Sequence, residues 1–201
     1  MGIIGGGQLG RMMVMAAQRL GCTCVVLDPA PGSPAGQVAG HQIVGHFHDP
    51  SRLRELVESV DVTTFDIEDI DSETLIELER EGHRIHPSPR VLAVIQDKLT
   101  QKQLIEEAGI GTAAFTELRG DFATAFADFG YPLVQKARRG GYDGRGVAVL
   151  RTPGEYDRHL PVPSFAERFI EAEKEIAVLV ARAADGDTRC YPVVEMLFRP
   201  G

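Results

Sequence analysis

A glycine-rich turn at residues 5–10, Gly-Gly-Gly-Gln-Leu-Gly, limits the fold of this chain more than any other feature. It follows a short apolar segment at Ile3-Ile4 and precedes residues 12–20, where apolar side chains recur at helical spacing until Gly21. A strand that passes through G-x-G-x-x-G into a helix is typical of an open parallel sheet, in which the turn and the helix start can bind a phosphate. We therefore expect a doubly wound α/β domain at the N-terminus.

The strand and helix alternation continues after this turn. Residues 24–27 form a continuous apolar run closed by Asp28-Pro29, which is typical of a buried parallel strand, and Cys22 and Cys24 are expected on one face of it. The pattern predicts further strands at 43–44 and 62–65, a helix at 50–59, and a helix that Ser72 caps.

The pattern changes near residue 85. Ser88-Pro89 predicts a helix start, and the spacing of Val91, Ile95 and Leu99 predicts one helix that continues to Gly109. Beyond it the sequence predicts an α+β module with short strands at 115–118, 131–136, 147–150, 165–170, 175–182 and 191–197, a helix at 122–129 and a turn at 185–186. We divide the chain into an N-terminal domain (1–87), a connecting helix (88–112), a second module (113–166) and the start of a further domain (167–201).

Composition narrows the classes of function. The chain has 201 residues and a formal net charge of -8, which argues against non-specific binding to nucleic acid or to anionic membranes. Three cysteines without a Cys-x-x-Cys pattern predict reduced thiols in a cytoplasmic protein. The first residues lack the basic and apolar regions of a secretory signal, and no apolar stretch is long enough to predict a membrane span.

The turn at residues 5–10 leaves its ligand open. Asp28 ends the second predicted strand, where a dinucleotide-binding domain places the acid that binds ribose. The turn therefore fits a nicotinamide dinucleotide, another phosphorylated ligand, or a purely structural role.

A second glycine cluster favours phosphate chemistry. Residues 136–146, Lys-Ala-Arg-Arg-Gly-Gly-Tyr-Asp-Gly-Arg-Gly, join two predicted strands through a basic loop that can close over a ligand. Lys136 and Arg145 supply the positive charge that phosphoryl transfer needs. A hairpin with a solvated tip is the alternative. A Walker A loop is excluded because no Gly-Lys-Ser/Thr is present and no helix follows.

Taken together, these motifs resemble one enzyme family. Residues 5–12 (Gly-Gly-Gly-Gln-Leu-Gly-Arg-Met), 96–98 (Gln-Asp-Lys), 100–102 (Thr-Gln-Lys) and 140–146 (Gly-Gly-Tyr-Asp-Gly-Arg-Gly) occur in the order found in 5-(carboxyamino)imidazole ribonucleotide synthases, which are ATP-grasp enzymes. The resemblance implies a pre-ATP-grasp domain, an ATP-grasp lid and the start of the central ATP-grasp domain. It also implies ATP and Mg²⁺ as cofactors, 5-aminoimidazole ribonucleotide and bicarbonate as substrates, carboxyphosphate as intermediate, and a homodimer.

The same resemblance assigns residue roles. The ATP-binding positions that it implies are Lys98, Lys136, Gly141, Tyr142, Asp143, Gly144, Arg145, Gly146, Val147, Glu167, Arg168, Phe169, Ile170 and Glu175. Within this set, residues 167–170 form the adenine hinge and Glu175 binds the ribose. The positions implied for the ribonucleotide are Gly7, Gln8, Leu9 and Glu68, and the catalytic positions are Tyr142, Asp143 and Arg145.

This chain departs from the family pattern at three positions. Asp69 stands where the family usually has Asn, Phe198 replaces a His, and Lys98 replaces a common Arg and cannot make the bidentate contact of a guanidinium. The family's metal ligands lie beyond Gly201, so no residue is assigned to a metal, and His46 and His48 are expected in an exposed loop. Three alternatives stay open: a formate-dependent ribonucleotide transformylase, an NAD(P)-binding module, and a nucleotide-binding remnant without turnover.

Overall fold

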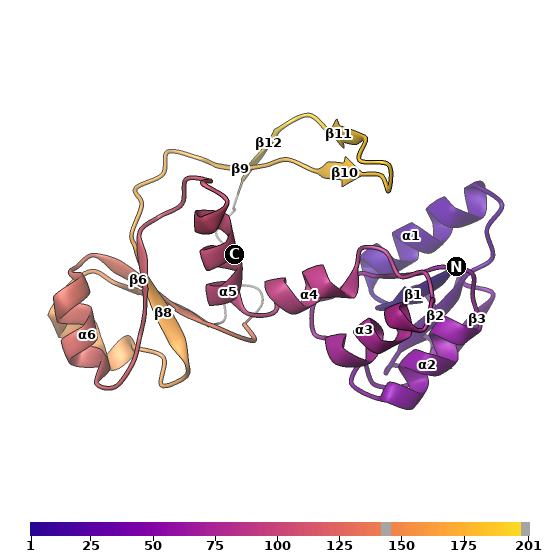
Figure 1. Ribbon diagram of the computed structural model, residues 1–201, viewed down its shortest axis with the longest axis horizontal. Coiled ribbons are helices and arrows are strands. Elements are labelled where there is room, and N and C mark those ends of the chain that lie inside the picture. Colours follow the sequence, from indigo (N-terminus) through magenta and orange to yellow (C-terminus); the bar gives the residue numbers. More distant parts are fainter. Residues whose placement is uncertain (142–145, 198–201) are drawn as a thin grey trace.

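The N-terminal part of the chain is a parallel sheet covered by helices on both faces. The computed structural model describes residues 1–141 and 146–197. The strands of this sheet are β1 (Gly2–Ile4), β2 (Val25–Asp28), β3 (His41–Val44) and β4 (Thr63–Phe65). They lie in the order β3-β2-β1-β4 and all pair in parallel (Figure 1). The chain winds outward from β1 in one direction and then returns to its other side, so the predicted doubly wound arrangement is confirmed.

Alternate residues of β1 explain why both faces are covered. Ile3 packs on one face with Val14 and Ala17 of α1 (Gln8–Arg19). Ile4 packs on the opposite face with Leu53 of α2 (Pro50–Glu58) and with α3 (Ser72–Arg80). Because successive side chains of a strand point to opposite faces, one three-residue strand anchors two cores.

Three details of this domain differ from the prediction. Met12 and Leu20 of the predicted apolar helix face are 58% and 83% exposed, because Val14 and Ala17 supply the buried contacts. Asp71, not Ser72, caps α3, since its carboxylate accepts from the backbone N–H groups of residues 73 and 74. Cys22 and Cys24 do not share a strand, because β2 begins only at Val25; Cys22 is exposed and Cys24 is buried.

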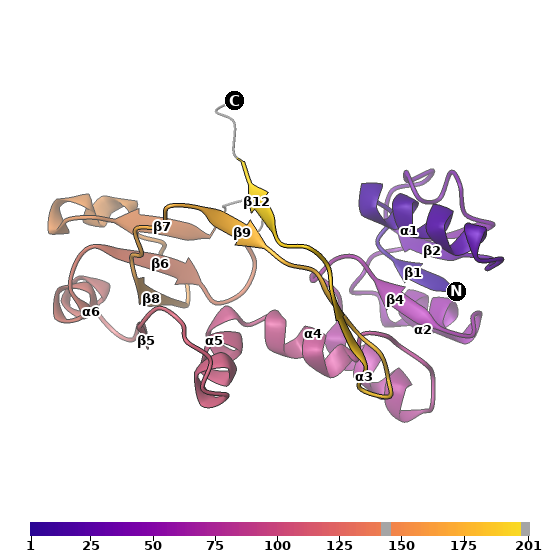
Figure 2. The same cartoon turned by 90° about the horizontal axis from the view of Figure 1, so that it is seen from above.

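The single helix predicted from residue 89 to 109 is wrong. Two helices are present, α4 (Pro89–Ile95) and α5 (Lys98–Glu107), and they bridge the two parts of the chain (Figure 2). Ser88 caps α4 as predicted, but Asp97 accepts from the N–H groups of Leu99 and Thr100 and so begins a new helix. Val91 and Ile95 are consequently exposed, whereas Leu99 is buried.

The second module is an antiparallel sheet. Its strands are β5 (Phe115–Glu117), β6 (Leu133–Ala137), β7 (Val147–Leu150) and β8 (Ser164–Arg168), in the order β5-β8-β6-β7. One face packs on α6 (Phe122–Phe129) and a 3-10 helix, η1 (Pro153–Arg158), around Phe126, Leu133 and Leu150. The other face carries Lys136 beside Phe165 and Val147, as the strand register requires. The α+β character predicted for this region is confirmed.

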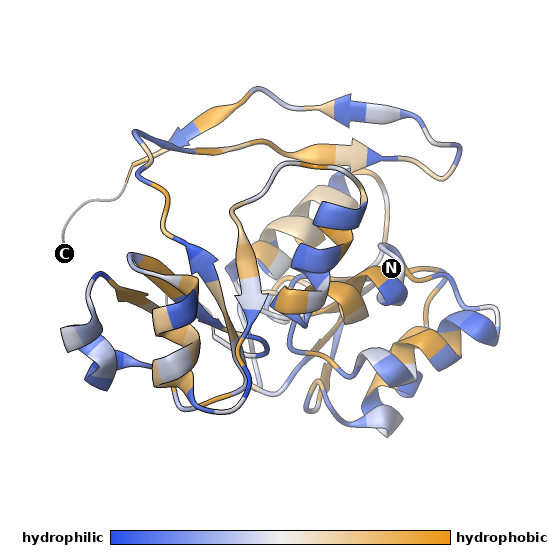
Figure 3. Ribbon diagram, turned by 60° about the vertical axis from the view of Figure 1, so that its left-hand side comes forward, coloured by the Kyte–Doolittle hydropathy of each residue, from blue (hydrophilic) through white to orange (hydrophobic). Residues whose placement is uncertain are grey.

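The last described segment is a long hairpin. Its strands β9 (Glu175–Ala177) and β12 (Val194–Met196) pair with each other, as do β10 (Val180–Arg182) and β11 (Thr188–Cys190). The single strand predicted at 175–182 is therefore two short ones, and the turn predicted at 185–186 connects β10 to β11. Apolar side chains of this hairpin, Leu179 and Val193 among them, are exposed. Figure 3 shows hydrophobic stretches along both arms of the hairpin ribbon.

Among the described residues, no helix combines the length and the apolar character needed to cross a membrane.

Candidate functional site

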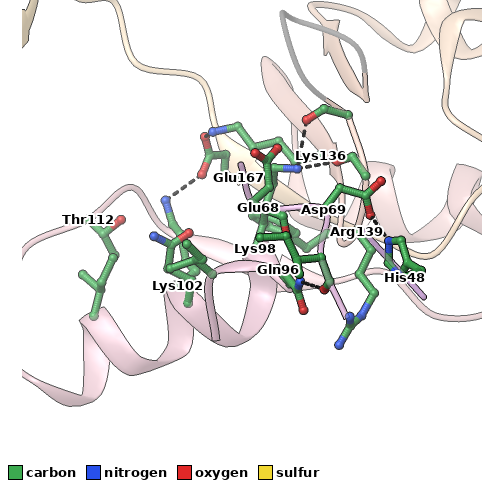
Figure 4. A pocket seen from close by; sticks show the side chains of 17 residues that line it. His48, Glu68, Asp69, Gln96, Lys98, Lys102, Thr112, Lys136, Arg139 and Glu167 are labelled. Atoms are coloured by element: carbon green, nitrogen blue, oxygen red, sulfur yellow. Dashed lines mark hydrogen bonds and ion pairs between the residues drawn. The ribbon is translucent and has the colours of Figure 1, made fainter. Parts of the chain in front are cut away.

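A cavity of about 790 Å³ lies where the two parts of the chain meet. The N-terminal domain contributes Glu68 and Asp69, which follow β4. Helix α5 contributes Lys98 and Lys102, which are four residues apart and therefore share a helix face. The open face of the second sheet completes the wall with β6 and β8 (Figure 4). The cavity therefore combines the carboxyl edge of a parallel sheet, where ligands of such sheets bind, with a cationic sheet face.

The most enclosed charge in the cavity is Glu167 of β8, which is 8% exposed. One of its oxygens accepts from the ammonium of Lys102 at 2.6 Å, and the other pairs with Lys136. Burial by itself raises the pKa of Glu167, but hydrogen bonds and positive charge from the two lysines outweigh it, so the pKa lies below its usual value. Glu167 is consequently an ionised carboxylate held between two cations.

A second buried carboxylate fixes the start of α5. Asp97 is 7% exposed and accepts from Arg138 at 2.6 Å, while Arg138 also donates to Glu117 at 2.8 Å. Burial raises the pKa of Asp97, and the bonds from Arg138 and from two backbone N–H groups more than offset this, which leaves the pKa below its usual value. Arg138 lies at the end of β6, so this pair joins α5 to the start of the second glycine cluster.

Lys98 also connects the start of α5 to the second glycine cluster. Its ammonium donates to the carbonyl oxygens of Gly140 and Gly141 at 2.5 and 3.3 Å. Its backbone N–H donates to the carbonyl of Arg138 at 2.8 Å. The ammonium therefore lies at the entrance of the glycine-rich loop, where the resemblance expects phosphate.

Two carboxylates hold the first glycine turn. Asp28 accepts from Gly6 N–H at 2.8 Å, and Asp66, at the end of β4, accepts from Gly10 N–H at 3.2 Å. A Cβ on Gly6 would lie 2.3 Å from the Ser33 hydroxyl oxygen, so the turn has no room for a side chain there. Both oxygens of Asp28 accept from backbone N–H groups, those of Gly6 and Ala30, so this carboxylate has a structural role in the turn.

The cavity gathers some of the predicted residues. Glu68, Lys98, Lys136, Gly141 and Glu167 line it. Val147 lies on the same sheet face, directly across the ladder from Lys136. Gly7, Gln8 and Leu9 are exposed at the first turn of α1, at the carboxyl edge of β1 next to β4, but they do not line the cavity.

Other predicted residues lie elsewhere. The Arg168 side chain points away from the cavity, because its guanidinium donates to the carbonyl of Phe129 and lies over that ring. Phe169 packs under Arg151, and Ile170 and Glu175 are exposed. A base in the cavity could therefore contact the backbone of Arg168 but not its side chain. Gly146 has a positive φ of 77° beside the sheet, and Tyr142, Asp143, Gly144, Arg145 and Phe198 lie outside the described residues.

Several residues of the site received no role from the sequence. Lys102 pairs with Glu167 across 65 positions, and Gln96 donates to the carbonyls of Glu68 and Ile70 at 2.7 Å each. The spacing of Lys98 and Lys102 places them on one helix face even in the single helix predicted from residue 89 to 109, but it does not show that Glu167 lies opposite Lys102. His48, in the loop where it was expected, bonds Asp69 at 2.9 Å.

The described residues do not offer a metal site. Among residues 1–141 and 146–197, no three His, Cys, Asp or Glu side chains gather closely enough to hold an ion.

Comparison with known proteins gives the class first. Residues 1–96 match the family model of the ribonucleotide synthetase preATP-grasp domain, and residues 103–201 match that of the ATP-grasp domain. With the parallel sheet, the antiparallel sheet and the cavity between them, these matches define an ATP-grasp chain.

Individual relatives narrow this class. The N5-carboxyaminoimidazole ribonucleotide synthase of Synechococcus elongatus is 38% identical over 96% of this chain and 51% of its own length. The crystal structure of N5-carboxyaminoimidazole ribonucleotide synthetase from Thermotoga maritima has a TM-score of 0.90 at 47% identity, over 97% of this chain and 52% of that one. The Aspergillus clavatus enzyme in complex with ADP and 5-aminoimidazole ribonucleotide has a TM-score of 0.88 at 33% identity, over 98% and 53%. The chain belongs to the N5-carboxyaminoimidazole ribonucleotide synthase family, and it spans about half the length of the relatives it matches.

Proposed function

We propose that this chain takes part in the ATP-dependent carboxylation of 5-aminoimidazole ribonucleotide. In that reaction bicarbonate attacks the γ-phosphorus of ATP, which gives carboxyphosphate and ADP. The exocyclic amine of the ribonucleotide then attacks the carboxyl carbon, phosphate leaves with the electrons of the C–O bond, and the nitrogen gives up one proton to solvent or to the departing phosphate. The product is 5-(carboxyamino)imidazole ribonucleotide, an intermediate of purine biosynthesis, and the setting is the cytoplasm.

The observation that carries this proposal is one cavity that is lined both by the carboxyl edge of the parallel sheet and by two lysines. Glu68, which follows β4 at the carboxyl edge of the parallel sheet, lines the same cavity as Lys98 of α5 and Lys136 of β6. The sheet edge suits the ribonucleotide, and the two lysines suit the phosphates of ATP. A reaction between two bound molecules needs both at one place, and a cavity lined by residues of both kinds supports this proposal.

The residues divide the work as follows. Lys98 and Lys136 neutralise charge that develops on the transferring phosphoryl group. The backbone of residues 167–170 receives adenine, and Glu175 receives the ribose. Glu68 and the turn at residues 7–9 hold the ribonucleotide, with Tyr142, Asp143 and Arg145 beside it. The resemblance to the family supports bicarbonate as co-substrate and a homodimer as the assembly.

Phosphate release tests this proposal. With ATP, Mg²⁺ and bicarbonate, release is expected to depend on 5-aminoimidazole ribonucleotide; turnover that is indifferent to the ribonucleotide contradicts it. Replacing bicarbonate by formate separates this reaction from that of a formate-dependent transformylase. Lys136→Ala is expected to weaken ATP binding about a hundredfold while the protein stays folded, because one charge-assisted phosphate contact is worth ~3 kcal/mol. Lys174→Ala, at an exposed pair with Glu195, is the matched control.

A further inference from the structure

Three of the four lysines of this chain line one cavity, although the chain has a net charge of -8. Lys98 bonds backbone carbonyls, whereas Lys102 and Lys136 share the carboxylate of Glu167 (Figure 4). Two cations on one buried carboxylate leave a local charge of +1 in this cluster. One of the two lysines is therefore in excess of what Glu167 needs, and the structure shows which one.

The two lysines differ in how firmly they are held. The Lys102 side chain is 13% exposed, bonds Glu167 at 2.6 Å and lies over the ring of Phe115, with its ammonium 5.7 Å from the ring centre. The Lys136 side chain is 32% exposed and lies on the open sheet face next to Val147. Lys102 is thus enclosed by a carboxylate and an aromatic ring, while Lys136 is accessible to a ligand in the cavity.

A buried carboxylate must keep at least one cationic partner. Removing the only partner of a buried charge costs several kcal/mol, about 3–5 in measured cases. If Lys136 were alone with Glu167, an incoming phosphate would have to break that pair and leave the carboxylate unpaired. With Lys102 in place, Glu167 keeps a partner when Lys136 turns to the phosphate.

We propose that Lys102 is a positioning residue for ATP, which holds Glu167 so that Lys136 is free to bind phosphate. Lys102 does not contact the nucleotide in this arrangement; it acts through Glu167. The inference rests on the proposed function only in that the cavity binds ATP, and it does not depend on which molecule is carboxylated.

ATP affinity of the protein, measured by calorimetry at pH 8 with MgATP, tests the first consequence. Lys102→Met leaves Glu167 with Lys136 alone, so the Kd for ATP is expected to rise about tenfold, a change of ~1.4 kcal/mol. Lys102→Arg keeps the charge and is expected to stay within about threefold of the wild type, ~0.7 kcal/mol. Lys174→Met, which removes an exposed lysine, is expected to leave the Kd unchanged.

A double variant separates positioning from direct contact. Lys102→Met together with Glu167→Gln removes one charge of each sign and restores the local charge of +1, so ATP affinity is expected to return to within about threefold of the wild type. If Lys102 touched the phosphates itself, the second substitution would not restore binding, and the proposal would be overturned. An unchanged Kd for Lys102→Met would overturn it as well.

The pH dependence of ATP affinity distinguishes a positioning role of Lys102 from a merely structural one, because a structural role predicts no difference in pH profile between the variant and the wild type. In Lys102→Met the buried Glu167 has lost one of its two cationic partners, while α5 still contributes Lys98 and β6 still contributes Lys136. Loss of that partner raises the pKa of Glu167. Protonation of Glu167 then releases Lys136, so the affinity lost at pH 8 is expected to recover as the pH falls through this raised pKa. Wild-type affinity is expected to show no such gain, and parallel profiles for the two proteins would count against the proposal.

Two further comparisons cover a variant that does not fold and a failure of the proposed function. Should Lys102→Met fail to fold, Glu167→Gln is compared with the double variant, in which no buried charge is unpaired; equal ATP affinities support the proposal and a tenfold difference overturns it. A wild type that binds no ATP overturns both this inference and the proposed function. A wild type that binds ATP but releases phosphate without the ribonucleotide contradicts the proposed reaction alone.

Discussion

Arg138 and Asp97 join the end of a strand to the start of a helix. The guanidinium of Arg138 donates to Asp97 from Nε at 3.1 Å and from a terminal nitrogen at 2.6 Å, and Asp97 at the same time caps α5. Because Lys98 and Lys102 both project from α5, the position of two cations of the cavity depends on this one pair.

Removing Arg138 is expected to destabilise the protein. Arg138→Met leaves the buried Asp97 without its cation, and we expect a loss of about 2 kcal/mol in the free energy of unfolding. This is below the ~3–5 kcal/mol of a fully buried pair, because 31% of the Arg138 side chain reaches solvent. Urea denaturation measures the change. Arg139→Met is the control, since Arg139 is 67% exposed and only 4.0 Å from Asp97, and equal losses for both variants would refute the assignment.

The first glycine turn allows a sharper test. A Cβ on Gly10 would lie 2.2 Å from the carbonyl oxygen of Gly5, whereas a Cβ on Gly7 would have nothing within 4 Å. Gly10→Ala would gain up to ~1 kcal/mol of helix propensity, but a clash with backbone costs more. We expect a net loss of about 2 kcal/mol for Gly10→Ala and about 0.5 kcal/mol for Gly7→Ala, which replaces a helix N-cap. Thermal unfolding of both variants decides this, and a stable Gly10→Ala protein would show that the turn and α1 are less closely packed.

Acid is expected to weaken the fold through Glu167. Its pKa is lower in the folded chain than the usual value near 4.5, so the folded state prefers the ionised form. The stabilisation is therefore complete above the usual pKa and is lost as the pH falls through the lower, folded value. In Glu167→Gln the free energy of unfolding should fall less steeply below pH 4.5, whereas Asp97, whose pKa is also lowered, still contributes. Denaturation series at several pH values measure the slopes, and identical slopes for the two proteins would contradict this role.

The sequence was informative where a short pattern fixes a local conformation. The glycine turn at residues 5–10 and the apolar run at 24–27 predicted the parallel sheet, because both signals are complete within a few residues. The basic glycine cluster predicted the β6–β7 hairpin for the same reason.

Long-range charge pairing was not predictable in this way. Glu167 was expected at an adenine hinge, yet its carboxylate is buried between Lys102 and Lys136, which only the folded chain brings together. The break between α4 and α5 was missed because apolar spacing continues across it, while Asp97 is drawn into a cap and an ion pair. Tertiary contacts here override the local helix pattern.

Gln96 and Asp97 are neighbours in sequence but serve different halves of the chain. Gln96 donates to carbonyls beside Glu68 in the N-terminal domain, and Asp97 binds Arg138 in the second module. A single peptide unit, ~3.8 Å from Cα to Cα, therefore separates the residue that bonds the N-terminal domain from the residue that bonds the second module. Adding or deleting one residue between Gln96 and Asp97 would turn one of these two side chains away from its hydrogen-bond partner. We expect chain length to be invariant here, while loops such as the one that follows η1 tolerate insertions.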